Sequence, residues 1–298
     1  MNRLLILAAV AVTGLWSCSD DNGKYDATGS FEAIEVIVSS EANGKILSFN
    51  INEGDRISAG DIIGHIDSLQ LYYKKEQLRA GLRAVDIRKP DIRKQIAVLE
   101  QQIATAESER KRMQNLVDAK AGNQKALDDI TNQLAFLRKQ YDAQNSTLAK
   151  TSGSADAEAE GLVYQVMQLE DMLAKCRITN PQTGVILAKY VEAGELAVQG
   201  KPLYKVADTD LLYLRAYVTA SQLSQLKAGQ DVRVFADYGD DGRKEYPGII
   251  TWVSSKAEFT PKGIQTKDER ANLVYAIKVA VQNDGYLKIG QYGEMKFQ

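Results

Sequence analysis

Few side chains in this sequence could carry out catalysis or bind a metal ion. The 298 residues include one histidine (His65), two cysteines (Cys18 and Cys176) and five scattered methionines. Catalysis by a nucleophile needs a base beside it, and zinc or copper sites need several Cys, His or Met side chains close together. The sequence also contains no GxxxxGK[ST] loop to hold nucleotide phosphates. We therefore expect no enzyme, no metal site and no cofactor.

The composition excludes several further classes of protein. Hydrophobic residues make up 44% of the chain and charged residues 26%, which is typical of a folded, soluble protein. The 37 Lys and Arg nearly balance the 39 Asp and Glu, so no basic field favours nucleic acid. A length of 298 residues allows one large domain or two to three smaller ones.

The first 30 residues are typical of a targeting segment with a tether. Arg3 precedes an apolar run that is too short to cross a bilayer and that ends at Cys18. The ending Leu-Trp-Ser-Cys resembles the lipobox of bacterial lipoproteins, which implies a signal peptide over residues 1–18 and a lipid on Cys18. The alternative is an ordinary signal peptide with an incidental cysteine. The polar residues 19–30 are predicted to be a flexible tether.

An internal repeat with an offset of 140 residues is the strongest pattern in the sequence. Gly44, Gly54 and Gly60 of the first copy match Gly184, Gly194 and Gly200 of the second without a gap. Glycines at one spacing indicate two copies of one strand-and-turn pattern. The copies resemble the two half-motifs of a biotinyl/lipoyl-type β-sandwich, split apart as in HlyD-type adaptors (membrane fusion proteins). We assign them to residues 31–68 and 178–208.

Two potentially reactive side chains, His65 and Cys176, lie in or beside the repeat and are expected to be structural. His65 matches Lys205 of the second copy, so we expect a surface residue on a strand and not a catalytic base. Cys176 is expected to be a small buried apolar residue.

Residues 69–177, between the two copies, are predicted to form a long helical hairpin. Apolar residues recur in steps of three and four, first from Leu78 to Val117 and again from Leu127 to Cys176, as in a coiled-coil seam. The turn falls at 118–123. Pro90 should kink or interrupt the first arm, and the small residues of 151–161 predict a weak or frayed middle of the second arm. The alternative is a coiled coil formed between separate chains.

Residues 209–298 are predicted to form a small β-barrel. Short strands are expected at 211–220, 231–236, 248–254, 273–281 and 293–297, with one short helix at 221–227 and a loop up to residue 272. The segments 257–270, 273–279 and 287–293 closely resemble the barrel domain of HlyD-type adaptors that serve ABC exporters.

The resemblance covers residues 30–298 and implies both fold and function. The fold class is an elongated α+β chain: a split lipoyl-like sandwich (barrel-sandwich hybrid) with an inserted antiparallel coiled-coil hairpin, then a β-barrel. The function implied is a periplasmic adaptor in a Gram-negative cell envelope, lipid-anchored with the inner membrane preferred. Its partners would be an inner-membrane exporter, of ABC type in preference to RND, and a TolC-like outer-membrane channel.

The family also implies a docking site at the hairpin tip and a ring of copies. An Arg, a Leu four residues on and a Ser seven further on dock into the channel in this family; Arg112 and Leu116 match, and Asn123 replaces the Ser. A homo-oligomeric ring, a hexamer by resemblance, is implied as well.

Three other functions are alternatives to an export adaptor. A lipoate or biotin carrier needs a lysine at the tip between the half-motifs, where this chain has the helical insertion. A metal-efflux adaptor would cluster Met or His ligands. An envelope-spanning coiled-coil spacer without a pump is the best alternative.

Overall fold

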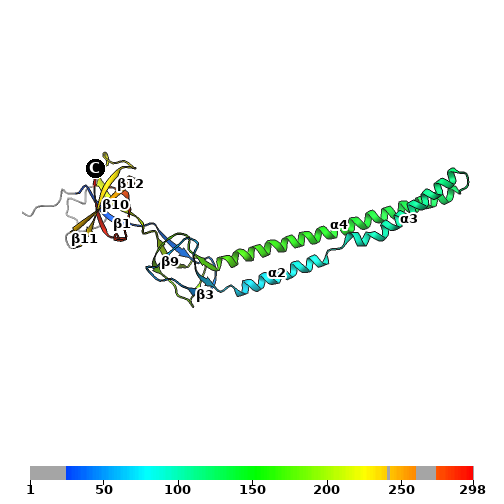
Figure 1. Ribbon diagram of the computed structural model, residues 1–298, viewed down its shortest axis with the longest axis horizontal. Coiled ribbons are helices and arrows are strands. Elements are labelled where there is room, and N and C mark those ends of the chain that lie inside the picture. Colours follow the sequence, from blue (N-terminus) through cyan, green and yellow to red (C-terminus); the bar gives the residue numbers. More distant parts are fainter. Residues whose placement is uncertain (1–24, 240–241, 260–272, 298) are drawn as a thin grey trace, which may run out of the picture.

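The computed structural model describes residues 25–239, 242–259 and 273–297. These residues form three parts in a line, with a β-barrel at one end, a β-sandwich in the middle and a helical hairpin projecting away from it (Figure 1). The elongated α+β architecture predicted from the sequence is confirmed.

The barrel is a closed ring of six antiparallel strands around one apolar core. Its strands alternate buried and exposed side chains, as in β10, because one face of each strand lines the interior. In order around the barrel the strands are β1 (Ala27–Glu32), β10 (Leu211–Thr219), β13 (Leu273–Gln282), β12 (Gly242–Phe259), β11 (Asp231–Tyr238) and β14 (Tyr292–Phe297). The short helix α5 (Ala220–Leu223) follows β10, and Thr219 starts it by forming an N-terminal capping box with Gln222.

Two features of the barrel differ from the sequence prediction. Residues 27–30 were expected to belong to a flexible tether, but they lie in β1, which pairs with β10 and β14 and buries Phe31. The first strand of the barrel therefore comes from the N-terminal side of the sandwich, and the tether boundary moves to before Ala27. In addition, β12 continues to Phe259, and register shifts after Ile250 and Val253 accommodate its extra residues.

The sandwich consists of two four-stranded sheets, each of which combines strands from both halves of the repeat. One sheet is ordered β2-β9-β7-β4 and the other β6-β5-β3-β8. The strands are β2 (Glu35–Ser39), β3 (Gly44–Phe49), β4 (Arg56–Ile57), β5 (Ile62–Ile66), β6 (Arg177–Thr179), β7 (Gly184–Lys189), β8 (Leu196–Ala197) and β9 (Pro202–Ala207).

The two repeat copies bond to each other reciprocally. The amide of Gly54 donates to the carbonyl of Ile186, and the amide of Gly194 donates to the carbonyl of Ile46, both across about the same distance (2.9 and 2.8 Å). Gly54 and Gly194 adopt φ values of 92° and 97°, a conformation that side-chain-bearing residues resist. The equal spacing of the glycines thus reflects two turns of the same conformation, each hydrogen-bonded to a strand of the other copy. Neither half could form this sandwich alone.

The hairpin joins the two halves of the sandwich through three helices. Its first arm is α2 (Leu69–Arg88) and α3 (Ile92–Asp118), and its second arm is the single helix α4 (Gln124–Lys175). Pro90 lies in the interruption between α2 and α3, as predicted, and the Asp91 side chain accepts a bond from the Lys94 amide to start α3. The 52 residues of α4 extend about 78 Å at 1.5 Å per residue.

The predicted weak middle of the second arm is wrong, since α4 is helical throughout residues 151–161. This segment lies opposite the break at Pro90: Lys89 pairs with Asp156 at 3.0 Å and Arg88 with Glu158 at 2.8 Å. Because the facing arm is interrupted at this height, α4 needs no large seam residue there. Alanine and glutamate are also good helix formers, so the helix continues.

Candidate docking surfaces

The hairpin tip is a tight turn that brings the ends of α3 and α4 together. The amide of Ala121 donates to the carbonyl of Leu116 at 2.9 Å, and Lys120 takes a positive φ of 59°. A Cβ on Gly122 would lie 2.7 Å from the backbone nitrogen of Val117, so only glycine fits there. The turn is therefore built from backbone contacts that leave its side chains exposed.

Two of the three predicted docking residues share one exposed flank of α3. Arg112 and Leu116 are one helical turn apart, and Leu116 is 41% exposed although it lies beside the buried seam. The Arg112 guanidinium forms an ion pair with Glu109, and 67% of the Arg112 side chain remains exposed. The tip thus presents an apolar side chain next to a cation at its far end.

The third predicted residue, Asn123, has a structural role at the same tip. It is the N-cap of α4, and its side-chain oxygen accepts a hydrogen bond from the Lys125 amide at 2.9 Å. Asn123 follows Gly122, which packs against Leu116, so the structure places Asn123 near Leu116. Capping uses one lone pair of the Asn123 side-chain oxygen and leaves the side-chain NH2 group free to donate to a partner.

The base of the hairpin is anchored by a buried polar pair that sequence reasoning missed. Asn180, just after β6, is 2% exposed and donates to the carbonyls of Ser58 and Gln182. Its oxygen accepts a bond from the buried Tyr204 hydroxyl at 3.2 Å, and burial raises the pKa of Tyr204 to about 12. This pair fixes the strand that leaves α4. The sequence indicates this residue only through the repeat, because the offset of 140 residues aligns Asn180 with Ser40, which is equally buried.

The two remaining reactive side chains have the surroundings expected from the sequence. Cys176 is 2% exposed, its thiol lies 3.3 Å from the Met172 carbonyl, and burial raises its pKa. His65 is exposed on β5, with its ring 3.3 Å from the Ser48 hydroxyl. Within residues 25–239, 242–259 and 273–297, no three Cys, His, Asp or Glu side chains lie together as a metal site would require.

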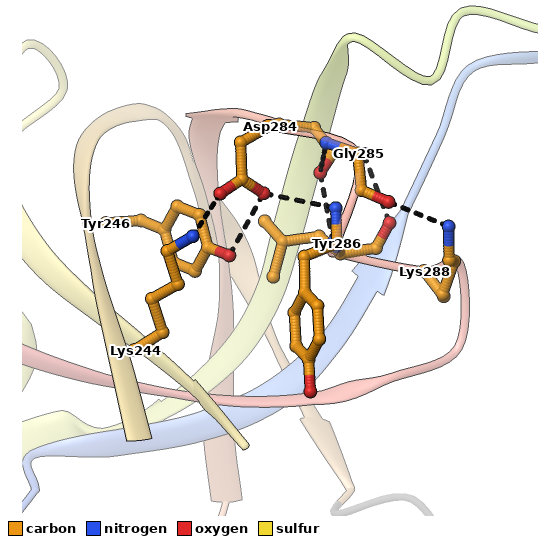
Figure 2. A network of polar contacts seen from close by, with 8 residues as sticks. Lys244, Tyr246, Asp284, Gly285, Tyr286 and Lys288 are labelled. Carbon is orange, nitrogen blue, oxygen red and sulfur yellow. Dashed lines mark hydrogen bonds and ion pairs between the residues drawn. The ribbon is translucent and has the colours of Figure 1, made fainter. Parts of the chain in front are cut away.

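A polar network holds the barrel loop 283–288 (Figure 2). Residues of this loop also line a cleft together with residues of the sandwich. Asp284 forms an ion pair with Lys244 and accepts hydrogen bonds from the Tyr246 hydroxyl and the Tyr286 amide. These contacts, with Lys244 first, lower the pKa of Asp284, whereas burial raises the pKa of Tyr246. The loop is thus held in one shape beside the linkers that lead to the sandwich.

The junction between barrel and sandwich contains a cleft of about 320 Å³. Val185 and Leu187 of β7 line one side of this cleft, and Leu287 and Ile289 of the barrel line the other. An ion pair between Arg56 of the sandwich and Asp210 of the linker crosses the junction. Because this pair is solvent-exposed, it contributes little to holding the two parts together.

The predicted signal peptide, the lipidation site Cys18 and residues 19–24 of the predicted tether lie outside the described residues. Among the helices that the structure describes, none combines the length and apolar character needed to cross a membrane.

The chain is similar to known proteins over its whole length. It is 28% identical to the UPF0194 membrane protein YE2891 of Yersinia enterocolitica, covering 100% of this chain and 99% of that protein. It is also 28% identical to the UPF0194 membrane protein YbhG of Salmonella gallinarum, over 98% of this chain and 94% of that protein.

Solved structures share the fold. MacA from Actinobacillus actinomycetemcomitans superimposes with a TM-score of 0.54 at 22% identity, over 91% of this chain and 76% of MacA. A MacA-MexA chimera containing the α-hairpin domain of Pseudomonas aeruginosa MexA gives a TM-score of 0.53 at 20% identity, over 90% of this chain and 78% of the chimera.

The family model for the barrel-sandwich hybrid domain of RND membrane fusion proteins (RND MFP) matches residues 35–209. This range spans the split sandwich and the whole inserted hairpin, which are the parts that the repeat and the seam first indicated. The chain therefore belongs to the membrane fusion protein family of periplasmic adaptors.

Proposed function

We propose that this chain is a non-enzymatic, lipid-anchored adaptor subunit of a tripartite exporter. It would connect an inner-membrane exporter, ABC in preference to RND, with a TolC-like outer-membrane channel. The signal peptide over residues 1–18 directs it to the periplasm, and lipid on Cys18 holds it at the inner membrane. Several copies form a ring, with six as the number expected from the family.

The observation that carries this proposal is the exposed tip at the end of a long hairpin. Arg112 and Leu116 lie near the far end of the hairpin, whose second arm extends about 78 Å from the β-sandwich. Catalysis and small-ligand binding have no use for such a projection, whereas bridging two membrane partners requires it. A side chain that is apolar and partly exposed beside a cation suits contact with another helical protein.

Cross-linking from the tip tests the bridging role. A Lys120→Cys variant of the full chain, at native expression level, is treated in cells with a cross-linker that carries one thiol-reactive and one photoreactive group, then affinity-purified and analysed by mass spectrometry. A Lys139→Cys variant, about 22 Å down α4, is the matched control. We expect an outer-membrane channel through residue 120 but not residue 139, and a permease with its ATPase in the same purification.

Each other outcome has a definite meaning. Recovery of an RND pump in place of a permease and ATPase contradicts the ABC assignment and leaves the adaptor role. Recovery of this chain alone through residue 120 contradicts the adaptor role and favours an envelope spacer.

Reversing the charge at the tip tests the docking residues. Arg112→Asp should reduce the channel cross-link about tenfold or more, because a buried carboxylate without a partner is costly at an interface. Lys111→Asp makes the same charge change about 100° around α3 and should leave the cross-link near the parent level. Equal losses in both variants, with helix content by circular dichroism unchanged, would contradict a specific role for Arg112.

A further inference from the structure

The α2 helix carries a second apolar stripe, on the face that points away from α4. Its inner face, with Leu78, Leu82 and Val85, packs in the hairpin seam. The outer stripe repeats at the helical spacing, is interrupted by Glu76 and stays exposed: Leu69 (52%), Tyr73 (56%), Ala80, Ala84 and Ile87 (84%). We call these five residues the back face of α2. A hairpin of two helices gives such a second stripe nothing to pack against.

The α4 helix has an outward face at the same distance from the sandwich. Tyr164 is 62% exposed and Met167 is 56% exposed, on the side of α4 opposite the seam residues Leu162 and Leu169. Glu160 lies one turn before Tyr164 on the same side, and the Tyr164 hydroxyl bonds to its carboxylate. We call Glu160, Tyr164 and Met167 the back face of α4. The two back faces point to opposite sides of the hairpin.

The heights of the two back faces match along the hairpin. The Arg79–Glu170 ion pair places those residues at one height. Ala80 is one residue and Met167 three residues beyond that pair toward the tip, so their heights differ by about 3 Å. A small side chain on one back face is therefore level with large apolar ones on the other, which suits packing of a ridge into a groove.

The charges of the two arms are complementary. The α2 helix contains five basic and two acidic residues, a net charge of +3, while residues 158–175 of α4 contain four acidic and one basic, a net charge of -3. Of these charges, Arg79 and Arg88 already pair with Glu170 and Glu158 within the hairpin. Arg83 on the edge of the α2 back face and Glu160 differ in height by about 4.5 Å, counted from the Arg88–Glu158 pair. Within the described residues, no ion pair involves Arg83 or Glu160.

From these observations we propose that the back face of α2 in one copy packs on the back face of α4 in the next copy. The contact is head-to-tail, so a pair of copies keeps one free α2 back face and one free α4 back face, and copies can add until a ring closes. Contact between two α2 back faces would oppose like charges. This inference rests on the side-by-side copies of the proposed adaptor and identifies the surfaces that join them.

Disulfide formation between two differently labelled copies tests the contact. Full-length Ala80→Cys and Met167→Cys chains with different affinity tags are co-expressed and oxidised in membranes. We expect a mixed dimer from this pair, little self-dimer from Ala80→Cys alone and none from the parent chain, which reports on Cys18 and the buried Cys176. The control pair is Ala80→Cys with Ala157→Cys, about 15 Å from Met167 along the same face of α4.

Charge exchange provides the second readout. Arg83→Glu or Glu160→Arg should each reduce the mixed dimer about two- to fivefold, as expected for one exposed ion pair, and the double exchange should restore it. Absence of the mixed dimer overturns the proposal, as does a self-dimer of Ala80→Cys in its place. Equal yields from the Met167 and Ala157 pairs overturn it too. Since this assay needs neither pump nor channel, its failure is separate from failure of the tip cross-link.

Discussion

Replacing Asn180 with leucine should destabilise the sandwich at the point where the hairpin joins it. Leucine has the same branched arrangement of four side-chain heavy atoms as asparagine, but its methyl groups can bond to none of the three partners. The Tyr204 hydroxyl is fully buried and would lose its acceptor, at a cost of about 1–3 kcal/mol. Water can reach the carbonyls of the less buried Ser58 and Gln182, so these add about 1 kcal/mol. We expect a total loss of about 2–4 kcal/mol in the free energy of unfolding.

A double-mutant cycle isolates the bond between Asn180 and Tyr204. Tyr204→Phe alone should cost about 1–2 kcal/mol because it removes the donor to the asparagine oxygen. In the double variant no buried hydroxyl is left without a partner, so its cost should fall below the sum of the single costs by about 1 kcal/mol or more.

Hydrogen exchange of the β6 and β9 amides measures these free energies within the sandwich. Trp252 lies in the barrel, so its fluorescence during urea unfolding is an internal control that should change little. Additivity of the two substitutions to within about 0.3 kcal/mol would refute the direct coupling. If the barrel, followed by Trp252 fluorescence, lost as much unfolding free energy as β6, the destabilisation could not be assigned to the hairpin base.

Three further predictions concern pH and the tip. Because burial raises the pKa of Tyr204 to about 12, the sandwich should lose stability as pH rises from 10 to 12, and Tyr204→Phe should remove this loss in alkaline melting curves. The Asp284 pKa is lowered by Lys244, so the ion pair contributes stability above the ordinary carboxyl pKa and loses it as pH falls; Asp284→Asn should flatten this acid dependence. Gly122→Ala forces a Cβ against the backbone of Val117 and should speed amide exchange in the tip turn while helix content stays constant.

Patterns that repeat along the chain predicted most of the architecture. The glycine spacing identified both halves of the sandwich because the same turn conformation is needed twice, and the three-and-four spacing identified both arms of the hairpin. The first barrel strand was missed because β1 is short and its partners, such as Tyr217 and Met295, lie far away in the sequence. The continuity of α4 through residues 151–161 depends on the break in the facing arm, which a reading of one arm alone does not include.

The proposed docking residues could be predicted only from a motif. Arg112 and Leu116 came from resemblance, and in the structure they share one exposed flank of α3. Asn180 carries no local signal, since one asparagine after a strand is usually a turn residue. Its burial follows from the second copy of the repeat, which brings Tyr204 over it.

In the proposed assembly, the long hairpin would link the stability of one copy to its neighbours. Each arm buries a single seam, and the first arm is interrupted at Pro90, where the cross-arm contacts include two exposed ion pairs of small energetic value. A second stripe on α2, packed on the next copy, would add apolar burial on the sandwich side of this break. The α2 amides should therefore exchange more slowly in the assembled protein than in the monomer, by a larger factor than those of α3 near the tip. The hairpin would then become stiff only when the copies assemble, which is also when its tip would contact a partner.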